Sequence, residues 1–173
     1  MAAVEKVTAA QLGAECPQLV HEILVLDAFL VRPLDQRRYT SITRNFVSDL
    51  LNVLGMETLG ELGIFPAVDE REPGWSFIQP ITTSHVSAHY FENPGRRPHI
   101  RIDAYSCASI NWNALIQVCH EHFELDEWCA CFIDRQLDHP HQRSVVELAG
   151  LGACVNSEIV LSEQPSLKHG VNQ

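Results

Sequence analysis

Apolar and polar residues alternate along two neighbouring segments in the middle of the chain. Such alternation is typical of strands, in which successive side chains point to opposite faces of a sheet. In the first segment one face carries His85, Ser87, His89 and Phe91, and the other carries Val86, Ala88 and Tyr90. In the second, Arg101, Asp103, Tyr105 and Cys107 lie opposite Ile100, Ile102 and Ala104. Residues 93–98 between them are rich in proline, glycine and arginine, so the pattern predicts an antiparallel hairpin.

Further strands and helices follow from the same kind of pattern. Helical spacing of apolar residues predicts a helix that begins at Asp35, as its cap, and ends at Gly55. A second helix is expected to begin at Asn111 or Asn113. A short helix is also expected over 7–20.

Apolar runs predict the remaining strands, which cover 21–32, 60–67, 76–81 and 128–133. Residues 144–162 carry apolar stretches that fit either a helix or a strand. Two helices and about six strands in mixed order predict an α+β fold. The expected architecture is a two-layer sandwich of an antiparallel sheet with helices on one face, which leaves the polar face for a site.

Length and charge narrow the class of protein. With 173 residues the chain predicts one domain over 21–135, with an N-terminal extension at 1–20 and a C-terminal extension at 136–173. A net charge of -10 argues against nucleic acid and acidic membrane surfaces as partners. No apolar run is long enough to span a membrane, and the first residues do not form a signal peptide. A cytoplasmic location with reduced cysteines is therefore expected.

The polar hairpin face also carries a specific arrangement of residues. Ser84 is followed directly by His85, a second histidine stands at 89, and the next strand reads Asp103-Ala104-Tyr105-Ser106-Cys107. Another serine, Ser76, precedes Ser84 by eight positions. This combination resembles the processing region of the prokaryotic-type S-adenosylmethionine decarboxylases, small enzymes that cleave themselves to make a pyruvoyl group. The resemblance covers residues 20–135.

The resemblance implies a role for each of these residues. Ser84 would attack the carbonyl of Thr83 and become the pyruvoyl cofactor, with His89 assisting the cleavage and Ser76 in support. Cys107 would return a proton to the substrate carbon after carbon dioxide leaves. Glu92 and Asp103 would contact the substrate. The resemblance further implies a homo-oligomer that acts in polyamine (spermidine) synthesis.

Departures from the family pattern keep two alternatives open. Thr83 stands where glutamate is usual, Tyr90-Phe91-Glu92 lacks the family's proline, and the hairpin loop is longer. One alternative is a pyruvoyl-dependent decarboxylase of ornithine or arginine. The other is an unprocessed, non-enzymatic paralogue that binds a small molecule, in which Ser84, His89 and Cys107 would be ordinary structural residues.

Other chemistry has weaker support. Cys129 and Cys131 are separated by one residue, whereas paired zinc-binding cysteines usually have two to four between them. We therefore expect no metal. A hydrolase using Cys107 and His89 lacks any oxyanion-hole signature.

Overall fold

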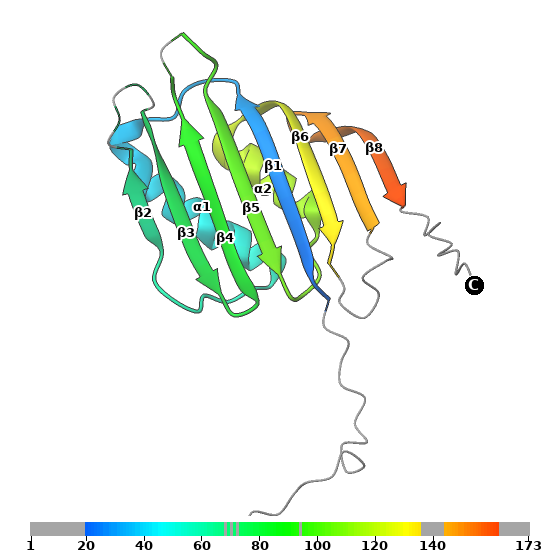
Figure 1. The fold of residues 1–173 in the computed structure, drawn as a ribbon. Coiled ribbons are helices and arrows are strands. Elements are labelled where there is room, and N and C mark those ends of the chain that lie inside the picture. The colour runs from blue at the N-terminus through cyan, green and yellow to red at the C-terminus, as the bar shows by residue number, and fades with distance from the viewer. Residues whose placement is uncertain are drawn as a thin grey trace, which may run out of the picture.

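The computed structural model describes residues 20–67, 69, 71, 73–93, 95–135 and 144–162. These residues form an eight-stranded sheet in the order β2-β3-β4-β5-β1-β6-β7-β8, and each neighbouring pair is antiparallel (Figure 1). The strands are β1 (Glu22–Leu30), β2 (Gly63–Pro66), β3 (Gly74–Ile81), β4 (Ser84–Phe91), β5 (His99–Ser106), β6 (Leu125–Asp134), β7 (Ser144–Leu151) and β8 (Cys154–Ser162). The helices are α1 (Tyr39–Leu54) and α2 (Trp112–Phe123), and a short 3-10 turn (Gln36–Arg38) precedes α1.

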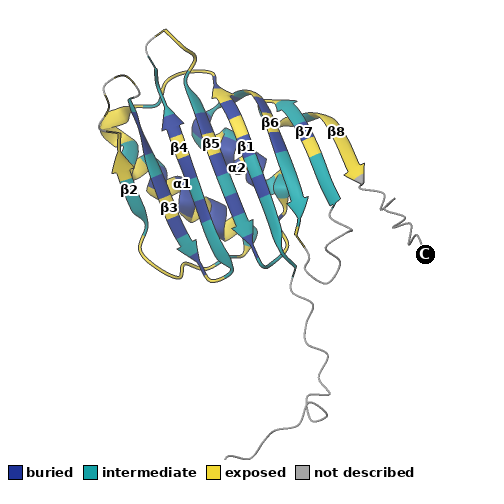
Figure 2. Cartoon of the chain, viewed as in Figure 1, coloured by how far each residue is buried: buried dark blue, intermediate teal, exposed yellow. Residues whose placement is uncertain are grey.

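Both helices lie on the same face of the sheet, and the other face is open (Figure 1). Burial alternates along the strands as a one-sided sheet requires. On β1, Leu24, Leu26 and Leu30 are buried beneath the helices, whereas Asp27 and Phe29 are exposed on the open face. Figure 2 shows this as alternating dark and light bands on the central strands. The predicted α+β two-layer sandwich is confirmed.

Local sequence signals place the helix ends. The Asp35 carboxylate accepts a hydrogen bond from the backbone of Arg37 and so caps the 3-10 turn that leads into α1. Gly55 ends α1 in the left-handed conformation, at φ 65°, which glycine adopts without a steric penalty. Asn111 caps α2 through its side chain, which accepts from the backbone of Ala114. The end at Gly55 and the cap at Asn111 agree with those predicted from the sequence, whereas α1 itself begins at Tyr39, after the 3-10 turn that Asp35 caps.

The core lies between the helices and the central strands. Phe46 of α1 is fully buried, and its ring packs against Phe77 of β3 and Phe123 of α2, with centroid distances of 5.9 and 4.6 Å. The indole of Trp75 donates a hydrogen bond of 3.0 Å to the buried hydroxyl of Thr43. This hydrogen bond satisfies both of these buried polar groups where α1 meets β3.

The sheet is wider than the sequence pattern predicts. Residues 144–162, which fit either a helix or a strand, form β7 and β8 and continue the same sheet beyond residue 135. The helix expected over 7–20 lies outside the described residues, apart from residue 20, which is not helical.

Replacing Phe46 with alanine should lower the free energy of unfolding by about 3–5 kcal/mol, because the cavity left beside the rings of Phe77 and Phe123 cannot collapse fully. Urea denaturation followed by circular dichroism measures this. Val53→Ala, at an exposed position of the same helix, is the matched control and should change stability by no more than about 0.5 kcal/mol. A Phe46→Ala loss no larger than the control's would contradict the described packing.

Candidate functional site

A turn of only two residues, Thr82 and Thr83, joins β3 to β4, so that Ile81 pairs with Ser84. Hairpins this short favour positive φ at the turn residues, which glycine and asparagine accept and β-branched threonine resists. The positive φ falls instead on Ser84, at 152°. For a residue other than glycine such a conformation costs about 1–3 kcal/mol. Backbone strain therefore lies at the residue that the sequence predicts to be processed.

The peptide bond between Thr83 and Ser84 is held by specific contacts. The backbone N–H of Cys107 donates to the carbonyl oxygen of Thr83 at 2.9 Å. The Oγ of Ser84 lies 3.2 Å from Nδ1 of His85. The hydroxyl of Thr83 is buried and has no hydrogen-bond partner among the described residues. The bond thus has a donor on its carbonyl, an imidazole beside its serine, and an unsatisfied hydroxyl next to it.

The ring of Tyr105 lies beside His85 and is itself held by an aromatic and a basic side chain. Tyr105 lies opposite His85 in the β4–β5 register, and the two rings meet edge-on with centroids 5.9 Å apart. The Tyr105 hydroxyl is 3.0 Å from Nδ1 of His21, and the Arg135 guanidinium lies over the Tyr105 ring at 5.1 Å. Tyr105 of β5, held by the residues just before β1 and just after β6, thus packs against the imidazole beside Ser84.

The β4–β5 register brings two more predicted residues to this end of the sheet. Ser84 pairs with Ser106, which places Cys107 next to the predicted scissile bond. Asp103 pairs with Ser87 and lies half-buried on the open face. Its carboxylate has no ion-pair or hydrogen-bond partner within the described ranges, so it remains available to a ligand.

Ser76 and His89 contact each other but lie away from Ser84. They pair across β3 and β4, with Oγ and Nδ1 2.7 Å apart. His89 lies five residue steps along β4 from Ser84, a distance of about 16 Å at the usual rise. The structure therefore brings together Ser84, Thr83 and Cys107, and separately Ser76 and His89.

Glu92 follows β4 at the end far from Ser84. Its carboxylate accepts hydrogen bonds from the Tyr90 hydroxyl at 3.0 Å and from Gln36 at 2.9 Å. Burial is the main cause that raises the pKa of Tyr90, and the Glu92 carboxylate raises it further. Glu92 thus joins the loop before α1 to β4 and is not beside the predicted scissile bond.

His85 belongs to the motif that carries the family resemblance, but that resemblance assigned it no role. Neighbouring residues of a regular strand point to opposite faces, so alternation predicts that Ser84 and His85 do not interact. The positive φ at Ser84 breaks that regularity and allows their side chains to meet. The available signal was the adjacent Thr82-Thr83 pair, two residues poorly suited to a two-residue turn.

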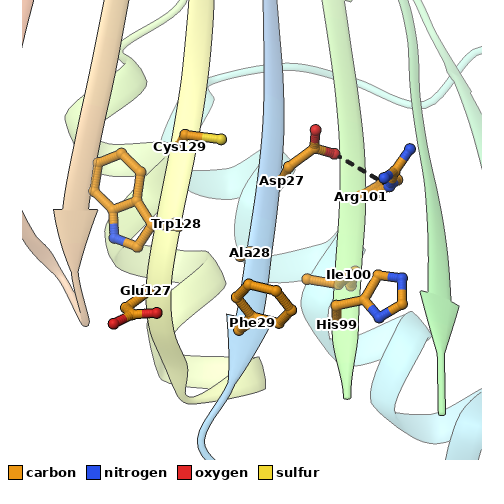
Figure 3. Close-up of a pocket in the computed structure, with 9 residues that line it drawn as sticks. All are labelled: Asp27, Ala28, Phe29, His99, Ile100, Arg101, Glu127, Trp128 and Cys129. Carbon is orange, nitrogen blue, oxygen red and sulfur yellow. Dashed lines mark ion pairs between the residues drawn. The ribbon is translucent and has the colours of Figure 1, made fainter. Parts of the chain in front are cut away.

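A separate depression of about 220 Å³ lies on the open face toward the other end of the sheet (Figure 3). Strands β1, β5 and β6 form it, and none of the predicted site residues lines it. The Asp27 carboxylate and the Arg101 guanidinium, 3.5 Å apart, form an ion pair at its side. A second depression of about 340 Å³ shares Asp27 and Cys129 with it. There burial, and secondly the Glu147 carboxylate, raises the pKa of the Cys131 thiol.

The described residues form neither a metal-binding cluster nor a membrane-spanning helix. Among the described residues, no group of three or more histidine, cysteine, aspartate or glutamate side chains could hold a metal ion. Neither helix in the described part of the chain is long and apolar enough to cross a membrane. No protein-family model matches the chain, and no curated protein matches it.

Strain at Ser84 can be measured directly. Ser84→Gly and Ser84→Ala both remove the hydroxyl, but only glycine accepts the positive φ without a penalty. We expect the glycine variant to be more stable to urea than the alanine variant by about 1 kcal/mol, the net of relieved strain and the extra freedom of unfolded glycine. At Ser87, a regular position of the same strand, the order should reverse. A less stable glycine variant at 84 would contradict a strained backbone there.

Proposed function

We propose that this protein is a self-processing, pyruvoyl-dependent decarboxylase, most simply of S-adenosylmethionine, which acts in the cytoplasm in spermidine synthesis. One observation carries the proposal: the strained Ser84 lies beside an imidazole, while a backbone N–H binds the carbonyl before it. These are the groups that an N-to-O acyl shift requires. The proposal explains why a serine occupies a position that glycine would fill at lower energy.

The first step uses three groups in contact. The Ser84 oxygen attacks the Thr83 carbonyl carbon as its proton passes to Nδ1 of His85. Negative charge then develops on the Thr83 oxygen, which accepts a hydrogen bond from the Cys107 N–H. The carbon–nitrogen bond breaks, the Ser84 nitrogen takes a proton, and an ester replaces the amide. Relief of the strained φ lowers the barrier to this rearrangement.

The second step divides the chain. Loss of the Ser84 α-proton expels the Thr83 carboxylate, which releases residues 1–83, and water then removes the Ser84 nitrogen as ammonia. The resulting pyruvoyl group at position 84 supplies an electrophilic carbonyl that accepts electrons from a bound substrate amine. The backbone of Cys107 adjoins this position, and we propose that its thiol returns a proton to the substrate carbon.

Asp103 and the open face provide the surroundings for a substrate. The Asp103 carboxylate, on the same face as Tyr105, suits a positively charged amine or sulfonium group. The proposal includes a homo-oligomer, as the resemblance to the decarboxylase family implies. The roles of Ser76 and Glu92 stay predictions. For cleavage we propose His85 in place of His89, because His89 contacts Ser76 and lies away from Ser84.

Intact-mass analysis of the purified protein tests the chain cleavage. Two fragments should be present, residues 1–83 and residues 84–173, the second with a pyruvoyl group in place of its amino terminus. A Ser84→Ala control should stay as one chain. A wild-type chain that stays intact after long incubation would contradict the self-processing mechanism and favour the non-enzymatic paralogue.

Paired histidine variants test which imidazole accepts the serine proton. His85→Gln should slow cleavage by about 100-fold or more, the usual contribution of a general base. His89→Gln should leave the rate close to that of the wild type, because His89 contacts Ser76 and not Ser84. Fragment formation on denaturing gels gives both rates. The opposite order would assign the base to His89.

Decarboxylation assays on the cleaved protein identify the substrate. Carbon dioxide release is measured from carboxyl-labelled S-adenosylmethionine, ornithine and arginine. We expect turnover of S-adenosylmethionine, which Cys107→Ala reduces strongly while leaving the fragments intact. Turnover of ornithine or arginine alone would keep the pyruvoyl chemistry and change the substrate.

A further inference from the structure

The last strand, β8 (Cys154–Ser162), ends one side of the sheet. It pairs with β7 through its inner edge, and its outer edge has no neighbouring strand in the described part of the chain. Figure 1 shows it beyond the region that the two helices cover. A row of unpaired backbone N–H and C=O groups along such an edge is a template for another strand.

Three consecutive apolar residues lie on this strand. Their exposed fractions are 51% for Ile159, 60% for Val160 and 45% for Leu161. From the register with β7, Ile159 and Leu161 lie on the open face and Val160 on the helix side. Both faces of the edge therefore expose apolar residues. Figure 2 colours much of β8 as exposed.

The residues of β8 contain none of the usual protection against edge pairing. The strand has no lysine, arginine or proline, and Glu158 is its one charged residue. The opposite edge of the sheet differs. There β2 has only four residues and ends in Pro66, which lacks a backbone donor. Head-to-tail pairing of β8 with β2, which would build open fibres, is therefore disfavoured.

The sequence of β8 suits antiparallel pairing with itself. When two copies meet about Ile159, Glu158 lies opposite Val160 and Ser157 opposite Leu161. The two glutamates do not face each other, so like charges are not brought into direct opposition. Each apolar residue gains a neighbour on its own face. A two-fold arrangement of this kind closes on itself and stops at a dimer.

We propose that β8 is an edge-to-edge interface with a second copy of this chain, and that it joins two sheets into one continuous antiparallel sheet. The interface is separate from the open face and from Ser84. It does not depend on the proposed decarboxylase activity, because β8 lies at the far side of β1, β6 and β7 from the β3–β4 turn.

Sedimentation of the full chain over a range of concentrations tests this interface. The wild type should dimerise, and Val160→Glu should raise the dimer dissociation constant by about 100-fold or more, since it puts a second carboxylate directly opposite Glu158 of the other copy, twice in each dimer. Val160 lies on the helix side, so this change does not alter the open face. Val53→Glu, at a comparably exposed valine on α1, and Phe29→Glu, on the open face, should both leave the dimer intact.

Other outcomes overturn the interface. A wild-type chain that stays monomeric at high concentration would do so, as would a dimer unaffected by Val160→Glu. A dimer lost with Phe29→Glu alone would place the contact on the open face instead. Circular dichroism of each variant confirms that the fold is retained. Chain cleavage, measured on the same samples, reports on the proposed function independently of these results.

Discussion

Two helices cover one face of an eight-stranded sheet, and the rest of the molecule depends on this one-sided burial. Every second residue of the central strands lies beneath α1 and α2, where apolar side chains such as Leu26 and Phe77 are removed from water. The residues between them face outward and are not needed for the core. The open face can therefore carry histidine, aspartate and hydroxyl groups with little loss of stability.

Strain at the β3–β4 turn follows from the same sheet. Antiparallel pairing of Ile81 with Ser84 leaves two threonines to reverse the chain, and neither adopts positive φ. The positive φ therefore falls on Ser84, and the pairing of β4 with β3 and β5 keeps that residue from adopting a more favourable φ. A conformation that would be costly in a free peptide is thus maintained, and it concentrates at the bond that the proposed reaction breaks.

The helical layer is narrower than the sheet, which explains the properties of the last two strands. Leu148 of β7 still reaches the core, but Val160 of β8 lies beyond it and is largely exposed. An apolar strand at such an edge is stable in water only if something pairs with it or tolerates its exposure. The helices cover only one face of the sheet, so the candidate site lies on the open face. They also do not extend as far as β8, so that edge strand stays exposed.

Local patterns were enough to predict much of this protein. Alternation gave the central strands and their faces, and Asp35, Gly55 and Asn111 gave the helix ends, because these signals act within a few residues. Residues 144–162 stayed ambiguous, since a short apolar run fits a strand or a helix until a neighbouring strand pairs with it. Only the tertiary structure placed Cys107 on the Thr83 carbonyl, His85 beside Ser84, and His89 far from both. Those contacts depend on strand register and on one strained torsion, which arise from pairing across the sheet. The adjacent threonines at 82 and 83 are poorly suited to the turn, but only that pairing decides that the strain falls on Ser84.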